Sequence, residues 1–173
     1  MTQQSRLVTQ FAPQILAAGP VAPALDLACG GGRNGLFLAR RGQPVVFADR
    51  QPEKLAAIAQ ELGTTADHEI WSVDLEAASG KPLAGRSFSS ILVFRYLHRP
   101  LLPAIRQAIT AGGLIVYETF TLDHAQYGRP TNPDFLLQPP ELPAAFSGRE
   151  ELHSYQGVCR SETGGREQAI AQL

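Results

Sequence analysis

The chain of 173 residues is 44% apolar and 18% charged, a composition typical of one soluble globular domain. Its 15 basic and 16 acidic residues give a net charge of −1, which excludes broad binding to nucleic acid or membranes through bulk charge. No apolar run approaches the ~20 residues of a membrane span. Cys29 and Cys159 form no paired motif. We therefore expect a single cytoplasmic domain over residues 1–173, with free thiols.

Short apolar runs alternate with helical patterns through the first two thirds of the chain. Residues 5–18 have apolar side chains at helical spacing, although Pro13 is expected to bend or divide this helix. Five strands follow, predicted over residues 24–28, 44–48, 68–73, 88–94 and 114–117. The helices between them are predicted over residues 34–41, 52–62 and 100–111, with Gly112 and Gly113 ending the last one. This alternation is typical of a parallel α/β sheet.

The pattern changes after residue 118. Residues 119–140 are rich in proline, glycine and aromatic side chains and are expected to form a long loop. A short helix around residues 141–146 precedes two strands, 151–158 and 166–173, which flank Gly164-Gly165 as an antiparallel hairpin. The last strand is apolar at its end, so we expect a few residues to follow it. The predicted fold is a Rossmann-like, doubly wound α/β sheet of about seven mostly parallel strands, with a C-terminal antiparallel hairpin and helices on both faces.

The most informative stretch lies at the end of the first predicted strand, where Asp26 precedes the glycines Gly30 to Gly32. Glycine has no Cβ, so the backbone can turn sharply there and a ligand can approach it closely. The following helix would direct its free N–H groups at the same point. Asp49 and Asp74 end the next two strands, and parallel sheets bind ligands outside such strand ends. We expect Asp49 to accept ribose hydroxyls, Asp74 to accept an adenine amino group, and Asp26 to attract a ligand cation directly or through water.

Each of these features also has another explanation. Asp49 could merely cap the helix that begins at Pro52, and Asp74 could begin a turn. The pattern Gly30-x-Gly32-x-x-Gly35 also satisfies the dinucleotide fingerprint. Two features count against a nicotinamide cofactor: the charge of Asp26 inside the first strand, and a terminal hairpin where a second nucleotide-binding half would lie.

The run Asp26-Leu27-Ala28-Cys29-Gly30-Gly31-Gly32 resembles the first motif of class I S-adenosylmethionine-dependent methyltransferases, acid-x-Gly-x-Gly-x-Gly, with Ala28 in place of the first glycine. The resemblance covers about residues 24–118, and the terminal hairpin is similar to the reversed last strand of that family. Residues 94–100, 117–120 and 128–137 look like a small bacterial branch near the tellurite-resistance and thiopurine-type methyltransferases. The resemblance implies S-adenosylmethionine as cofactor and S-adenosylhomocysteine as its product.

The resemblance also implies which residues bind that cofactor. It places the ribose acid on Asp49, the adenine acid on Asp74, and the residue against the adenine face on Arg50. The full expected set is Asp26, Ala28, Gly30, Gly32, Asn34, Asp49, Arg50, Asp74, Leu75 and Phe94. We find no residue cluster with metal-ligand spacing and expect no metal.

The segment after the fourth predicted strand is where the family places residues on the substrate side. Tyr96 is expected to flank the methyl donor or the acceptor, and His98 is the candidate base for an acceptor proton near neutral pH. A small-molecule acceptor, with an anion favoured, is expected to be lined by Arg95, Arg99, Tyr127 and Arg129. The alternative is that these residues only cap a helix or shape the loop, and that Glu118 orients a loop arginine.

The sequence thus predicts methyl transfer from S-adenosylmethionine to a small acceptor by in-line displacement. Positioning of the two reactants supplies most of such catalysis, so a dedicated base is optional. Two alternatives remain open: a regulatory module that binds S-adenosylmethionine without turnover, and, less favoured, an NAD-binding oxidoreductase.

Overall fold

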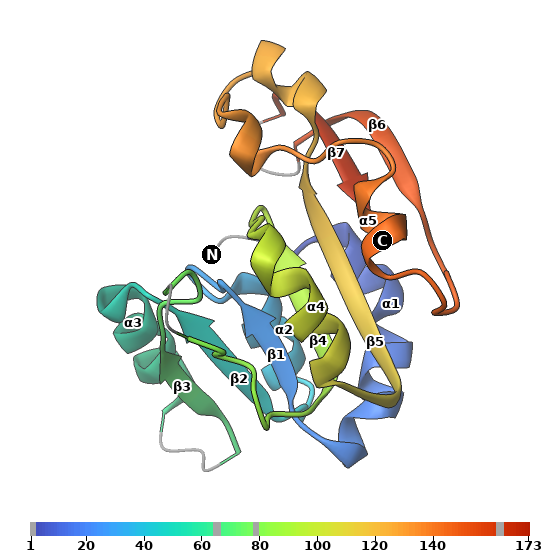
Figure 1. Cartoon of the computed structure of the whole chain (residues 1–173). Helices are drawn as coiled ribbons and strands as arrows, with labels where there is room; N and C mark the ends of the chain where they lie inside the picture. The colour runs from blue at the N-terminus through green and yellow to red at the C-terminus, as the bar shows by residue number, and fades with distance from the viewer. Residues whose placement is uncertain (1–2, 64–66, 78–79, 162–164) are drawn as a thin grey trace.

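The computed structural model describes residues 3–63, 67–77, 80–161 and 165–173. These residues form a seven-stranded sheet with the strand order β3-β2-β1-β4-β5-β7-β6 (Figure 1). Its strands are β1 (Ala24–Leu27), β2 (Val45–Asp49), β3 (Glu69–Ser72), β4 (Phe88–Phe94), β5 (Ile109–Phe120), β6 (Tyr155–Arg160) and β7 (Glu167–Gln172). Strands β1 to β5 pair in parallel, whereas β7 runs antiparallel to both β5 and β6. The predicted fold class is confirmed.

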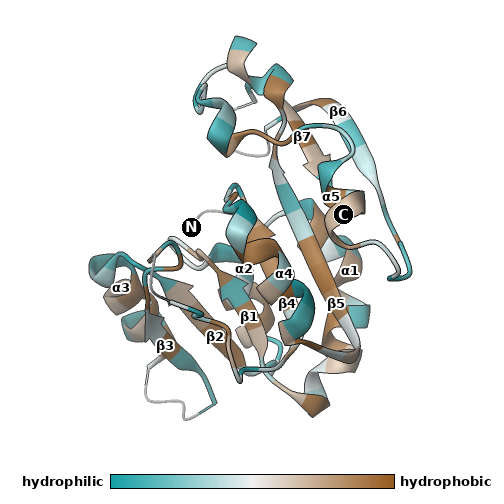
Figure 2. Cartoon of the chain, viewed as in Figure 1, coloured by the Kyte–Doolittle hydropathy of each residue, from teal (hydrophilic) through white to brown (hydrophobic). Residues whose placement is uncertain are grey.

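Helices cover both faces of the sheet, as predicted (Figure 1). One face packs against α1 (Arg6–Ala18), α2 (Arg33–Ala39) and α3 (Pro52–Leu62), and the other against α4 (Leu102–Ala108) and α5 (Glu141–Ala145). Short 3-10 turns complete the chain: η1 (Gly19–Val21), η2 (Arg99–Leu101), η3 (Leu122–Gln126) and η4 (Pro133–Phe135). Because β1 and β2 lie between these layers, every residue of both strands is buried. Figure 2 shows the same central strands as mostly apolar.

Helix α1 is one continuous helix rather than the two pieces that Pro13 could have produced. The Ser5 side chain caps it by accepting a hydrogen bond from the Leu7 N–H at 3.2 Å. Val8 and Ile15 are fully buried against the sheet, whereas Pro13 is exposed. Burial of this apolar stripe therefore outweighs the backbone hydrogen bond that proline cannot donate.

Strand β5 is longer than predicted, because α4 ends at Ala108 and Ile109 already belongs to the strand. Gly112 and Gly113 thus lie inside β5, and their assignment as a helix stop was wrong. A Cβ on Gly113 would lie 2.6 Å from the Ser89 carbonyl oxygen. This glycine therefore permits the close approach of β4 and β5 beside the register shift between Phe88 and Ser90.

The C-terminal part follows the predicted pattern. Residues 121–140 contain only short 3-10 turns and irregular backbone, and β6 and β7 form the antiparallel pair. Gly164 of the expected hairpin turn lies outside the described residues. Within those residues, no helix combines the length and the apolar character needed to cross a membrane.

Candidate functional site

A cavity of about 240 Å³ lies at the carboxyl ends of the parallel strands. It opens beside β1, whose neighbours on the two sides are β2 and β4, so the direction in which the chain winds reverses at this point. The lining residues are Ala28, Gly30, Asp49, Arg50, Gln51, Lys54, Val73, Asp74, Leu75, Glu76, Arg95 and Tyr96. Six of the ten residues expected to bind a cofactor are in this set.

The turn between β1 and α2 has the backbone geometry that its glycines suggest. Gly30 and Gly32 have φ angles of +54° and +70°. A Cβ on Gly32 would lie 2.7 Å from the Ile58 Cδ1 atom, and the left-handed backbone there also favours glycine. Ala28 also has a positive φ, of +54°, which is unfavourable for an L-residue. This backbone explains why the methyltransferase motif that the turn resembles has glycine at the position that Ala28 occupies.

Asp49 joins this turn to the start of α3. Its Oδ2 atom accepts a hydrogen bond from the Gly30 N–H at 2.8 Å, and its Oδ1 atom accepts one from the Gln51 N–H at 2.9 Å. The side chain is 6% exposed and contributes to the cavity wall. The bond to Gln51 reaches the N-cap residue of α3, which has no side-chain cap of its own. Each carboxylate oxygen still has a second lone pair, so the same group can accept bonds from a ligand.

Asp26 does not line the cavity. It lies beneath the turn, 3% exposed, with its Oδ2 atom accepting a hydrogen bond from the Gly35 N–H at 2.8 Å. Burial raises the pKa of the Asp26 carboxyl to about 7, although the Gly35 N–H and the nearby Arg33 act in the opposite direction. Because Asp26 is not part of the cavity wall, the structure does not place it in direct contact with a ligand. The carboxyl instead attaches the start of α2 to β1.

The far side of the cavity is formed by the ends of β2 and β3. Arg50 and Asp74 are exposed there, and Leu75 is buried at 7% exposure. The Asp74 Oδ1 atom accepts a hydrogen bond from the Glu76 N–H at 3.0 Å, which is the turn foreseen as its alternative role. Its other carboxylate oxygen and the Leu75 side chain provide one polar and one apolar contact for a planar ring.

Three of the expected cofactor residues lie elsewhere. Asn34 is 3% exposed, and its Oδ1 atom accepts a hydrogen bond from the Ser5 N–H at 2.9 Å, so it anchors the start of α1. Gly32 is buried against α3, and Phe94 packs partly buried against the core on the α1–α3 face. None of the three lines the cavity.

On the substrate side, Arg95 and Tyr96 line the cavity. Arg95 has a φ of +55°, a second L-residue in the left-handed region. The Tyr96 hydroxyl is buried, and the Glu76 carboxylate is its polar neighbour. Burial raises the pKa of Tyr96, and the neighbouring Glu76 carboxylate raises it further. Tyr96 thus belongs to the cavity wall with its hydroxyl beside the Glu76 carboxylate.

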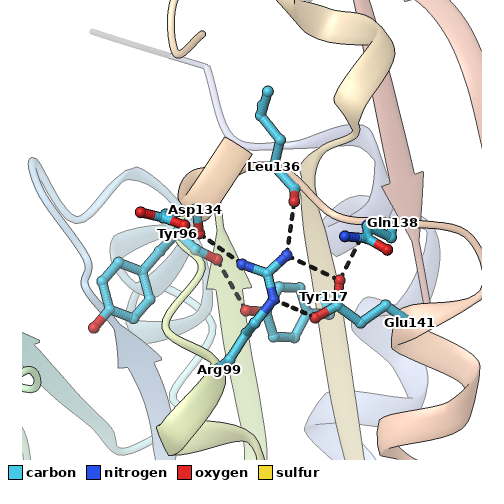
Figure 3. Close-up of polar contacts among 7 residues, drawn as sticks. All are labelled: Tyr96, Arg99, Tyr117, Asp134, Leu136, Gln138 and Glu141. Atoms are coloured by element: carbon cyan, nitrogen blue, oxygen red, sulfur yellow. Dashed lines mark hydrogen bonds and ion pairs between the residues drawn. The ribbon is translucent and has the colours of Figure 1, made fainter. Parts of the chain in front are cut away.

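Arg99 is not available to an acceptor, contrary to prediction. Its Nε and Nη2 atoms donate to the two carboxylate oxygens of Glu141, and Nη1 donates to the Asp134 carbonyl oxygen at 2.7 Å (Figure 3). Nη2 also donates to the Leu136 carbonyl oxygen at 2.8 Å. The guanidinium group thus ties the loop after β5 to the segment after β4. Glu141 lies 42 positions from Arg99 in the chain, so no local sequence pattern predicts this bidentate bond.

The other expected acceptor-side residues also lie outside the cavity wall. His98 directly precedes η2, and its side chain makes no capping hydrogen bond there. Tyr127 and Arg129 belong to the loop after η3. Glu118 is 5% exposed and accepts a hydrogen bond from the Gln172 Nε2 atom at 2.7 Å. The geometry therefore supports Tyr96 as a candidate catalytic residue more than it supports His98.

Sequence reasoning missed four residues of the cavity wall: Gln51, Lys54, Val73 and Glu76. Gln51 and Lys54 were accessible to prediction, because the start of a helix that follows a strand-end acid faces the same edge of the sheet. Among the described residues, no group of three or more His, Cys, Asp or Glu side chains is placed to hold a metal ion. A larger cavity of about 860 Å³ lies between α1, the first half of β5 and residues 146–153, away from the glycine turn.

Comparison with known proteins identifies the family and the fold of this chain. Residues 6–152 match the family of the tellurite resistance protein TehB. TehB from Haemophilus influenzae has a similar structure, with a TM-score of 0.66 and 22% identity over 93% of this chain and 60% of that one. This chain therefore spans about three fifths of the length of that protein.

Two further structures share the fold. The N-methyltransferase NodS from Bradyrhizobium japonicum WM9 has a TM-score of 0.65 and 17% identity over 95% of this chain and 92% of its own. CalS10 from Micromonospora echinaspora, an amino pentose methyltransferase solved with bound S-adenosylmethionine, has a TM-score of 0.56 and 17% identity over 95% and 89% of the two chains. No protein with a curated description matches the sequence. The chain belongs to the TehB family and has the fold of S-adenosylmethionine-dependent methyltransferases.

Proposed function

We propose that this protein binds S-adenosylmethionine in the cavity at the carboxyl ends of β1, β2 and β3, and transfers its methyl group to a small acceptor. The observation that carries the proposal is Asp49, which lies in the cavity wall while holding the Gly30 N–H at 2.8 Å. The carboxylate and the glycine backbone thus face one space. A ribose bound there would need a hydrogen-bond acceptor, and the amino acid tail of the cofactor would need to approach the backbone closely. Membership of the TehB family supports the same reaction class.

The residues of the cavity fit the parts of this cofactor. Asp49 would accept ribose hydroxyls, Asp74 an adenine amino group, and Leu75 would pack against the base. Ala28 and Gly30 would leave room for the amino acid tail. When bound, the cofactor supplies a methyl group made electrophilic by the positive sulfonium.

The chain's own contribution to the reaction is positioning and exclusion of water. Tyr96, with its buried hydroxyl, would orient either the donor or the acceptor. Its raised pKa keeps that hydroxyl protonated, so it acts as a hydrogen-bond donor rather than as a base. Holding the acceptor lone pair in line with the methyl group lowers such a barrier by roughly 7–11 kcal/mol in favourable cases. No dedicated base is needed in this scheme.

The chemical class of the acceptor is inferred from one residue of the cavity wall. Of the four residues expected to line an anionic acceptor, only Arg95 lines the cavity. Arg95 lies beside Tyr96, so an acceptor with one negative group remains the proposal, with Arg95 as its partner. The alternative, a donor-binding module without turnover, would share the whole cofactor side of the cavity, so an acceptor assay separates the two functions.

Calorimetric titration tests the cofactor. We expect S-adenosylmethionine and S-adenosylhomocysteine to bind one site per chain and NAD to give no heat. Binding of NAD alone would overturn the proposal. An acceptor screen that detects release of S-adenosylhomocysteine then tests turnover: binding without release by any small molecule would favour the regulatory module.

A further inference from the structure

Tyr117 is a tyrosine inside the hydrophobic core, near the carboxyl end of β5. Its side chain is 0% exposed, and its ring contacts Phe146 with the centroids 6.2 Å apart. The hydroxyl nevertheless has a partner: it donates a hydrogen bond to the Tyr96 carbonyl oxygen at 2.9 Å (Figure 3). Burial raises the pKa of Tyr117, which keeps this hydroxyl a donor. Phenylalanine would fill the same space, so what the hydroxyl adds to packing is this hydrogen bond.

The carbonyl that Tyr117 holds belongs to the turn that enters the cavity. Arg95, directly before Tyr96, has the left-handed φ of +55°, and its N–H donates to the Glu118 carbonyl oxygen at 2.8 Å. Two consecutive residues of β5 therefore hold two consecutive residues of this turn. Such a backbone conformation persists only where its surroundings determine it. Figure 3 shows the Tyr96 ring directed away from Tyr117 and Arg99.

We propose that Tyr117 is a positioning residue, whose hydroxyl holds the Tyr96 carbonyl and thereby sets where the Tyr96 phenol stands in the cavity. This inference rests on the proposed function, because the phenol has a role there only if a ligand lies beside it. Arg99 holds the same segment three residues further on, through Glu141 and the loop carbonyls. The segment is thus fixed at both ends, and its cavity-facing side chain has a defined place.

The chain contains four tyrosines, at positions 96, 117, 127 and 155, so fluorine NMR of 3-fluorotyrosine-labelled protein can observe Tyr96 alone. Tyr96→Phe assigns its resonance. Tyr117→Phe is the test variant. Tyr155→Phe is the matched control, because the Tyr155 hydroxyl also donates to a backbone carbonyl, that of Val158 at 3.1 Å, on the exposed strand β6.

In the wild type, S-adenosylhomocysteine is expected to shift the Tyr96 resonance. In Tyr117→Phe, the Tyr96 resonance of the free protein should move or broaden, and its response to S-adenosylhomocysteine should fall at least two-fold. The affinity for S-adenosylhomocysteine should stay within about three-fold, because Asp49 and Gly30 are untouched. 4-Aminophenylalanine at position 117 restores a donor and should restore the wild-type resonance. Tyr155→Phe should leave the Tyr96 resonance unchanged.

An unchanged Tyr96 resonance in folded Tyr117→Phe would overturn the positioning role. Unfolding of that variant, measured by circular dichroism, would also overturn it, because the hydroxyl would then serve stability alone. Failure of the proposed function has a different signature: wild-type protein that neither binds S-adenosylhomocysteine nor shifts its Tyr96 resonance.

Discussion

The Asp49 carboxylate holds the Gly30 N–H at 2.8 Å, and this bond connects the acid at the end of β2 to the glycine turn at the end of β1. The two residues are 19 positions apart in the chain but belong to neighbouring parallel strands, which end at the same edge. The bond orients the carboxylate before any ligand arrives. A preoriented acceptor loses less entropy on binding, which is why Asp49 is the first residue to test.

Replacing Asp49 with alanine should weaken S-adenosylhomocysteine binding by about 1–3 kcal/mol, because the ligand hydroxyls lose a charged acceptor. Calorimetry gives this affinity, and a melting curve measures the separate cost of losing the Gly30 and Gln51 hydrogen bonds. Asp123→Ala removes an exposed acid on η3 and is the control. Equal affinity in Asp49→Ala and wild type would remove Asp49 from the binding site.

Asp26 should make stability depend on pH. Its folded pKa of about 7 lies above the ordinary value of 3.8, so the folded state binds more protons between these values. Stability should therefore fall as the pH rises from about 4 to about 7, by roughly 4 kcal/mol at most. Asp26→Asn keeps an oxygen for the Gly35 N–H but cannot ionise. Urea unfolding at several pH values should show that the free energy of unfolding of Asp26→Asn, relative to wild type, grows across this range. If the two free energies change in parallel with pH, Asp26 is not the titrating group.

Ala28 occupies a left-handed position that glycine adopts without strain. Ala28→Gly should therefore stabilise the fold by about 0.5–1 kcal/mol, because relief of the positive φ exceeds the added entropy of the unfolded chain. Ala57→Gly, the same substitution at an exposed position in the middle of α3, is the matched control and should destabilise by about 1 kcal/mol. Chemical denaturation gives the free energy of unfolding of both variants. Destabilisation of similar size in both would show that the backbone at Ala28 is not strained.

Arg99 should protect the loop after β5 rather than bind the acceptor. Arg99→Gln removes its bonds to Glu141 and to the carbonyls of Asp134 and Leu136. Chymotrypsin should then cleave between residues 121 and 136 about ten-fold faster, which corresponds to about 1.4 kcal/mol of local opening. Arg149→Gln, which loses one bond to the Arg106 carbonyl, is the control and should leave this cleavage unchanged. Cleavage of Arg99→Gln at the wild-type rate would show that the loop is held by other contacts.

Much of the fold was readable from the sequence because it depends on local chemistry. Short, mostly apolar runs mark the central strands, and the acids at or near the ends of β1 and β2, Asp26 and Asp49, mark the binding edge. Gly30 signals the turn because a side chain there would oppose its left-handed backbone. The glycines at 112 and 113 misled the prediction, because glycine serves equally at a helix end and where two strands approach closely.

What the sequence alone determined is therefore the order of the elements and the edge at which Asp49 and Gly30 meet. Tertiary structure decided which side chains reach the cavity. Asn34 and Arg99 carry the polar groups of a binding site, yet the first holds Ser5 and the second holds Glu141. Those partners lie 29 and 42 positions away, and no spacing within a single element encodes them. A side chain's direction depends on the elements packed against it, and that packing exists only once the chain has folded.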